Sequence, residues 1–318
     1  MYNNKRICRK VFIFLFFYYF CRKRIKKMSN IQHKIALVIV LFHPDNEDIA
    51  YLLRLSTLYH GTIIDNTENN IFNAEYVNKM RYIGLGENKG IAEAQNIGIK
   101  TILKNNQIQY IIFLDQDSRI ENGYPIRITD EFYKFYSSGI NLSTLGPVII
   151  NKKNGETYKS VIHKNNYINE DFILKKHIIS SGSCISRKAL EDVGLYESPL
   201  FIDFVDDEWC WRANAKGYVC GITKNLSLEH RIGQREIHLG KYIISISAPQ
   251  RYYYQYRNYL WLIRRKYVPR QWKMAYGVKF AARFLYFPFL IKGGGKCWKF
   301  MARGILDGIR GIHSKIKK

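Results

Sequence analysis

Apolar runs and amphipathic stretches alternate along the first half of the chain. Residues 35–42, IALVIVLF, are continuously apolar and rich in β-branched side chains, which is typical of a strand buried on both faces. Residues 46–59 carry Ile and Leu at helical spacing, and Gly90 opens a second helical pattern. Further strands are predicted at 61–67, 81–86 and 110–118. Strands that alternate with helices predict an α/β fold with a mostly parallel sheet.

Polar residues follow the predicted strands at the point where each one ends. Asp65 and Asn66 follow the second strand, Asn88 follows the third, and Asp115 and Asp117 follow the fourth. Open α/β sheets bind their ligands beyond the carboxyl ends of the strands. We therefore expect these side chains to cluster at one edge of the sheet.

The sequence LDQDS places two acidic residues two positions apart. If the strand continued, Asp115 and Asp117 would point to the same side, and their like charges would need a compensating cation. A hard divalent ion with oxygen ligands, Mg²⁺ or Mn²⁺, bridging to a diphosphate fits this requirement. The alternative is an acidic turn that closes the strand.

A second acidic group precedes WCWRANAKGY. Asp206, Asp207 and Glu208 fall in the first turn of a short predicted helix, where the helix dipole favours anions. One of them could serve as a general base if it is held near an acceptor hydroxyl. The alternative is ordinary acidic decoration of a helix N-terminus.

Two further features of the chain are first interpreted as structural. The segment SGSC, residues 181–184, predicts a small-residue turn that leads into a helix closed by Gly194. His230 follows a predicted strand, next to Glu229. A lone histidine is usually structural, but an imidazole beside a bound metal would be a plausible ligand.

Charge is distributed unevenly along a chain of globular composition. The 318 residues are 47% hydrophobic and 24% charged, with a formal net charge of +24, which excludes disordered and fibrous classes. Residues 1–27 hold nine Lys or Arg and no acid, and residues 241–318 hold 18 against the single Asp307. A nearly neutral body with basic, aromatic ends favours attachment to an anionic membrane surface over binding to nucleic acid.

Neither end is predicted to span a membrane. The apolar run at residues 11–20 would rise about 15 Å as a helix, against about 30 Å of hydrocarbon. The basic cluster after this run disfavours secretion. The N-terminal segment is either an interfacial anchor or an upstream extension that the working protein, starting at Met28, lacks. Residues 251–318 should lie on a membrane, or alternatively pack on the body as ordinary helices.

The six cysteines lack metal-ligand spacing and are expected to be reduced, in a cytosolic protein.

Several sequence blocks in order resemble a known family. Between residues 35 and 259 the chain resembles the family 2 glycosyltransferases of GT-A fold, and most closely the bacterial rhamnosyltransferases of O-antigen and capsule assembly. The blocks are LFHPD, IIDNT, GENKGIAEAQNIGI, YIIFLDQDS, SGSCISRKALEDVGLYE, LFIDFVDDEWCWRA, LSLEH and RYYYQYRN. The resemblance implies a nucleotide-sugar-binding domain at residues 28–250, preceded by the extension 1–27 and followed by a helical membrane-associating region at 251–318.

The resemblance also implies roles for the polar strand ends. Asp65 would contact the nucleotide base, and Asn66, Asn88 and Gly90 would lie along the nucleotide. Asp117 would be the direct metal ligand, and Asp115 would support it beside the nucleotide. His230 matches a position that approaches the metal and the diphosphate in related enzymes.

The resemblance further implies the reaction. Aligning VDDEWCWR on the acidic block of the family makes Asp206 the base and Glu208 the second acid, but Val205 replaces a frequent Glu, which leaves Asp207 as an alternative base. A single base without a covalent intermediate implies inversion. The implied donor is dTDP-L-rhamnose, and the acceptor is a lipid-diphosphate oligosaccharide at the cytoplasmic face of the membrane.

Two alternatives to this reaction remain at the level of sequence. One is a related transferase that uses UDP-galactofuranose or UDP-N-acetylglucosamine, since a sequence does not display the details of a sugar pocket. The other is a non-enzymatic nucleic-acid-binding protein that uses the basic, aromatic tail. No known nucleic-acid-binding motif occurs in the sequence, and carboxylates at the sheet edge would repel phosphate without a metal.

Overall fold

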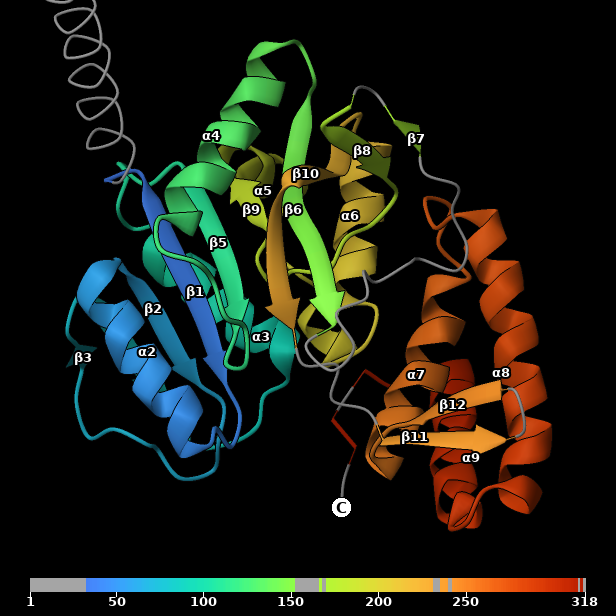
Figure 1. Ribbon diagram of the computed structural model, residues 1–318. Coiled ribbons are helices and arrows are strands. Elements are labelled where there is room, and N and C mark those ends of the chain that lie inside the picture. Colours follow the sequence, from blue (N-terminus) through green and yellow to red (C-terminus); the bar gives the residue numbers. More distant parts are fainter. Residues whose placement is uncertain are drawn as a thin grey trace, which may run out of the picture.

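The computed structural model describes residues 33–151, 166–167, 170–230, 235–239, 242–313 and 315–316. Figure 1 shows a large sheet flanked by helices and, beside it, a C-terminal group of helices with a small second sheet. The extension at residues 1–27, with its predicted apolar segment, lies outside the described residues.

The large sheet combines a parallel half with a mixed half. β1 (Ile35–Leu41) pairs in parallel with β2 (Gly61–Asp65) and β5 (Tyr110–Asp115), and β2 pairs in parallel with β4 (Met80–Gly84). In the mixed half β6 (Leu142–Asn151) and β10 (Val219–His230) run parallel, and β9 (Cys184–Ser186) joins this half to β5 by antiparallel pairing. The remaining strands are β3 (Tyr76–Val77), β7 (Asn166–Tyr167) and β8 (Phe172–Lys175). The order across the whole sheet is β3-β4-β2-β1-β5-β9-β6-β10-β8-β7.

Helices cover both faces of this sheet. One apolar cluster joins β1 to α3, α5 and α6, and a second joins the opposite face of β1 to α2 and α4. Every residue of β1 is buried, which confirms the two-sided burial expected from its apolar run. The helix bounds are α2 Asn46–Leu58, α3 Ile91–Ile102, α4 Tyr124–Ser137, α5 Arg187–Val193 and α6 Val205–Ala215, with a 3₁₀ turn at Ser198–Leu200.

The C-terminal part is helical, as expected. It contains α7 (Pro249–Leu262), α8 (Arg270–Leu290) and α9 (Gly294–Arg310), with the hairpin β11 (Arg235–Leu239) and β12 (Tyr242–Ile246). Ile246 packs on the apolar cluster of these helices, so this part begins before residue 251. Among the described helices, none combines the length and the apolarity that crossing a membrane requires.

Helix α7 fastens this part to the sheet domain through the loop that precedes α6. The side-chain amide of Asn258 donates to the carbonyls of Leu200 at 2.8 Å and Ile202 at 2.9 Å, and the fully buried Arg257 donates to Pro199 O at 2.5 Å. Trp261 joins the core cluster of the sheet domain. The basic, aromatic block therefore packs on the sheet domain along one helix. This agrees with the sequence-based interpretation that it forms ordinary helices packed on the body.

The four cysteines of the described chain are free and buried, which confirms the prediction of reduced thiols for them. They are Cys184, Cys210, Cys220 and Cys297. Cys8 and Cys21 lie outside the described residues.

Candidate active site

The amide residues expected along a nucleotide form one network at the carboxyl edge. Asn66 donates through Nδ2 to Asn88 Oδ1 at 3.1 Å and accepts from Lys89 N at 2.7 Å, while Gly90 N donates to Asn88 Oδ1 at 2.9 Å. The ends of β2 and β4 are adjacent because these strands pair in parallel. The sequence-predicted Asn66, Asn88 and Gly90 are thus brought together.

Gly90 has a backbone that only glycine adopts easily. Its φ is +85°, and a Cβ there would lie 2.6 Å from the Phe201 ring. Phe201 O in turn accepts the first backbone N–H group of α3, from Ile91 at 2.8 Å. The loop before α6 therefore rests directly on the glycine that begins α3.

Asp65 is fully buried, and its carboxylate accepts four hydrogen bonds. Thr67 donates from N at 3.2 Å and from Oγ1 at 2.6 Å, Ile71 N donates at 2.8 Å, and the Tyr82 hydroxyl donates at 2.5 Å. Burial, together with the hydrogen bond to Asp65, raises the pKa of Tyr82 to about 12. Asp65 thus holds the loop after β2, and its contact with a base stays a prediction.

The strand does not continue through LDQDS, so the condition under which strand alternation would align Asp115 and Asp117 is not met. β5 ends at Asp115, and Ser118 N donates to Asp115 O at 3.0 Å, which closes a turn. Gln116 Oε1 fixes this turn by accepting from Phe42 N at 2.6 Å. Both Asp115 and Asp117 are partly exposed at the edge of the sheet. The structure therefore combines the acidic turn with the strand-end position that ligand binding requires.

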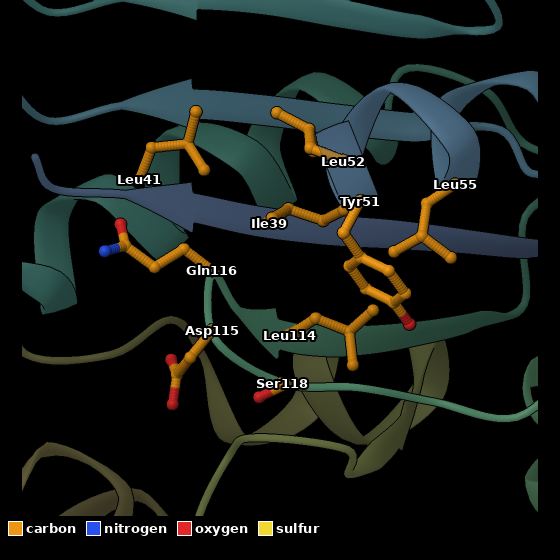
Figure 2. A pocket seen from close by; sticks show the side chains of 9 residues that line it. All are labelled: Ile39, Leu41, Tyr51, Leu52, Leu55, Leu114, Asp115, Gln116 and Ser118. Atoms are coloured by element: carbon orange, nitrogen blue, oxygen red, sulfur yellow. The ribbon is translucent and has the colours of Figure 1, made fainter. Parts of the chain in front are cut away.

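A small cavity behind this turn is too small and too apolar for a nucleotide sugar. Its volume is about 10 Å³, roughly the room of one water. Figure 2 shows that Gln116 points toward Leu41 while the Asp115 carboxylate points away from the leucine side chains. The nine residues around it are Ile39, Leu41, Tyr51, Leu52, Leu55, Leu114, Asp115, Gln116 and Ser118. Asp115 thus presents its carboxylate to the outside of this cavity.

Residues 180–181 connect the two acidic groups, a role that the sequence did not reveal. Ser181 Oγ lies 2.5 Å from Ser118 Oγ and 3.5 Å from Asp115 N. Ser180 N donates to Asp206 Oδ2 at 3.0 Å. Part of the signal was present in the small-residue block SGSC, which was interpreted only as a turn. The two acidic groups therefore share one supporting segment, residues 180–181, although Asp115 and Asp206 are 91 positions apart in the sequence.

Asp206 has the properties of a proton acceptor at neutral pH. Burial raises its pKa to about 7, the hydrogen bond from Ser180 N opposes this, and the negative charges of Asp207 and Asp115 raise it further. The Asp115 carboxylate is thus near enough to act on Asp206. A carboxylate with a pKa close to the working pH is suited to general base catalysis.

Asp207 lies beside His177, which the sequence analysis did not single out. His177 Nε2 is 3.8 Å from Asp207 Oδ1. Burial raises the pKa of Asp207, and the His177 charge opposes that rise. Asp207 therefore remains a second candidate for the base.

Glu208 has the contacts of a structural ion pair. Its side chain is fully buried, and its two oxygens accept from Arg212 at 2.9 and 3.0 Å. The Tyr267 hydroxyl donates to Oε1 at 2.7 Å, and Arg265 lies at 3.4 Å from the same oxygen. These contacts favour a structural role over the catalytic one that the sequence predicted.

The loop before α6 holds an unusual backbone. Phe201, Asp203 and Phe204 have φ values of 64–65°, a region in which a non-glycine residue is strained. Such strain persists where the surroundings over-determine it, and Asn258 and Arg251 supply the fixing contacts here. Arg251 Nε donates to both Asp203 oxygens, at 2.9 and 3.0 Å. The loop thus aims the acidic first turn of α6.

The acids fit a metal that a diphosphate helps to bind. In the described chain, no three His, Cys, Asp or Glu residues lie close enough to hold a metal ion by themselves. Mg²⁺ commonly takes only one or two carboxylates and completes its shell with water and substrate phosphates. Asp115 and Asp117 supply that number of carboxylates. His230 ends β10, and its side chain lies outside the described part of the chain.

Comparison with known proteins gives the class. The chain is 33% identical over 252 residues to the dTDP-rhamnosyl transferase RfbF of Shigella flexneri, a match that spans 74% of this chain and 81% of the relative. It is 25% identical over 198 residues to the low-salt glycan biosynthesis hexosyltransferase Agl10 of Haloferax volcanii, spanning 58% and 63% of the two chains. No family model matches the sequence.

Solved structures agree in fold. TarS residues 1–349 of S. aureus superimpose with a TM-score of 0.52 at 10% identity, covering 87% of this chain and 81% of TarS. GalNAc-T7 with UDP, GalNAc and Mn²⁺ superimposes with a TM-score of 0.50 at 12% identity, covering 88% of this chain and 56% of GalNAc-T7. The fold, the acidic edge and the relatives define a glycosyltransferase. More narrowly, the chain belongs to the family 2 rhamnosyltransferases of GT-A fold, the family of RfbF.

Proposed function

We propose that this glycosyltransferase transfers L-rhamnose from dTDP-L-rhamnose, with inversion, to a lipid-linked oligosaccharide. The observation that carries the reaction is the position of Asp206, whose pKa is about 7 and which shares the Ser180–Ser181 support with Asp115. The relative named a dTDP-rhamnosyl transferase supports the donor. The alternative donors, UDP-galactofuranose and UDP-N-acetylglucosamine, become outcomes of the test below.

Asp206 performs the proton transfer in this proposal. It accepts the proton of the acceptor hydroxyl while that oxygen attacks the anomeric carbon, and the bond from this carbon to the nucleoside diphosphate breaks. One displacement inverts the anomeric configuration. Asp117, supported by Asp115, would hold Mg²⁺ or Mn²⁺, which neutralises charge on the departing diphosphate when bound. The amide network of Asn66 and Asn88 positions the nucleotide.

A donor screen tests the proposal directly. We expect dTDP-L-rhamnose with Mg²⁺ or Mn²⁺ to release nucleoside diphosphate fastest among dTDP-, UDP- and GDP-sugars, with membrane extract as the source of acceptor. A chelator should reduce the rate by about 100-fold or more, because without the cation the two carboxylates repel the negatively charged diphosphate. Faster turnover of a UDP-sugar would reassign the donor. A rate that the chelator does not change would exclude metal dependence from the proposed reaction.

The exposed face of α8 supports work at a membrane surface. Met274, Val278, Leu285 and Phe289 are each 70–85% exposed. Their spacing of four, seven and four residues places them on one face of the helix. α8 contains no acidic residue, and exposed Arg and Lys lie on it and on α9 (Arg270, Lys279, Lys296 and Lys299). An apolar stripe with basic neighbours favours binding in the plane of an anionic membrane.

We expect the purified protein to sediment with vesicles containing phosphatidylglycerol and to be released in part by high salt. Leu285→Glu with Phe289→Glu should reduce vesicle binding by about tenfold or more, because charge replaces two apolar side chains that enter the interface. Tyr133→Glu is the matched control, since Tyr133 is 50% exposed on α4 of the sheet domain. A protein that ignores vesicles at low salt would contradict the proposed membrane location.

A further inference from the structure

The last described residues return from α9 to the nucleotide edge of the sheet. Gly311 ends α9 with a φ of +70°, and Ile312 N donates to Asp307 O at 2.9 Å. The His313 ring then stacks on Trp261, with centroids 4.3 Å apart and planes at 22°. Ile316 N donates to the Tyr254 hydroxyl at 3.4 Å. Figure 1 shows this dark red segment between α7 and the carboxyl edge of the sheet.

Lys315 lies between these two attachment points and reaches the amide network. Its Nζ donates to the backbone carbonyl of Asn88 at 2.6 Å and lies 5.9 Å from the Phe201 ring centroid. The Phe201 ring stacks on Tyr254, with centroids 4.5 Å apart, so the surface under Lys315 is fixed. The side chain is exposed, and neither a carbonyl nor an aromatic ring neutralises its charge. The segment after α9 thus holds a net positive charge beside Asn88.

Other sources of positive potential at this loop are already engaged. A helix N-terminus commonly binds phosphate, but Phe201 O already accepts from the N–H groups of Ile91 at 2.8 Å and Ala92 at 3.4 Å at the start of α3. The neighbouring Lys89 lies 3.7 Å from a carboxylate oxygen of Glu87. An anion that enters beside the amide network therefore meets Lys315 as a cation without a carboxylate partner in the described chain.

We infer that Lys315 binds the diphosphate of the donor and of the released nucleotide, so that the C-terminal segment completes the donor site. This inference rests on the proposed function, which places a nucleoside diphosphate along Asn88. A lysine ammonium on a flexible stem can exchange the Asn88 carbonyl for a phosphate oxygen without moving the backbone. The ammonium would also offset charge on the diphosphate as the sugar departs.

The test compares nucleotide affinity among lysine variants. We expect Lys315→Met to weaken dTDP binding by about tenfold, since a charge-assisted hydrogen bond to phosphate is lost. Methionine keeps a similar aliphatic length and the side chain is exposed, so the melting temperature should not change. Lys315→Arg should restore most of the affinity. Titration calorimetry with dTDP and with UDP at two salt concentrations gives the affinities, and the Met variant should show the weaker salt dependence.

Lys104→Met is the matched control, because Lys104 is an exposed lysine of the sheet domain with the same formal charge. Equal dTDP affinity in wild type and Lys315→Met would overturn the inference and leave the proposed function intact. An equal loss of affinity in Lys104→Met would show that the effect comes from net charge alone and would also overturn the inference. Absence of binding of both dTDP and UDP by the wild-type protein would instead remove the proposed function, and this inference with it.

Discussion

Replacing Asp206 by Asn is expected to lower the transfer rate by about 10²- to 10⁴-fold, the usual contribution of a general base. The affinity for the donor nucleotide should stay near that of wild type. An asparagine accepts the Ser180 N–H through its amide oxygen but takes up no proton, so the support of the site remains while the chemistry fails. Steady-state rates and nucleotide calorimetry on the same preparation separate the two effects.

The same substitution should stabilise the protein at neutral and alkaline pH. The pKa of Asp206 is raised by burial from 3.8 to about 7, so ionising this residue costs folding free energy. The cost is absent below pH 3.8, grows as the pH rises to about 7, and is constant above that. The melting temperature of Asp206→Asn relative to wild type should therefore increase across this window and level off near pH 8.

Asp207→Asn provides the matched control, since Asp207 lies next to Asp206 in the first turn of α6. We expect a much smaller rate loss from it. A larger loss in Asp207→Asn than in Asp206→Asn would assign the base to Asp207. In wild type, kcat should rise with pH to a plateau with a midpoint near pH 7, and the proposed divalent cation, when bound, would lower this midpoint by favouring the ionised form. A profile that falls with rising pH between pH 5 and 8 would exclude Asp206 as the base.

Replacing Glu208 by Ala is expected to lower the free energy of unfolding by about 3–5 kcal/mol, as is usual when one partner of a buried ion pair is removed. Arg212 would lose both carboxylate contacts and Tyr267 would lose its acceptor, and the carboxylate removed is itself fully buried. Urea unfolding followed by circular dichroism measures the loss. Glu208→Gln should lose less, since an amide still accepts one of these hydrogen bonds.

Glu191→Ala is the control for this result. Glu191 pairs with Arg187 at 2.6 Å four residues away on α5, but its side chain is 56% exposed. Exposed pairs of this kind contribute about 0.3–0.5 kcal/mol. Similar small losses in the two Ala variants would show that the Glu208 network does not stabilise the fold. If Glu208→Ala kept wild-type stability but lost transfer activity, Glu208 would have a catalytic role.

The strand pattern could be predicted because each signal is local. The apolar runs of β1 and β5 and the glycine before α3 lie within a few residues of the structure that they specify. The place of Asp206, Asp207 and Glu208 in the first turn of a helix was also predicted. The resemblance assigned the base to Asp206 and a second acidic role to Glu208, but the contacts that favour a structural role for Glu208 were not visible in the sequence. Successive residues on a helix point about 100° apart, and what each one meets comes from distant segments. Glu208 meets Arg265 and Tyr267 beyond α7, and Asp206 meets Ser180.

The polar strand ends show the same limit. The position of Asp65 at a strand end was visible in the sequence, but the four donors that occupy its carboxylate depend on how residues 67–71 fold back to it. The turn at Gln116 likewise depends on the distant Phe42. Position at the sheet edge was therefore predictable, whereas the contacts of each carboxylate were not.

The attachment of α7 to residues 199–203 bears on how enzymes of this family can be recombined. A chimera joined at residue 250 would place a foreign helix against a strained loop. In the native chain the side-chain amide of Asn258 donates hydrogen bonds to three backbone carbonyls of this loop. Exchange of the C-terminal helices would then change the orientation of the acidic first turn of α6 although no acidic residue had been replaced. Exchanged modules should instead carry residues 197–267 as one unit, with the strained loop and the helix that restrains it inherited from the same parent.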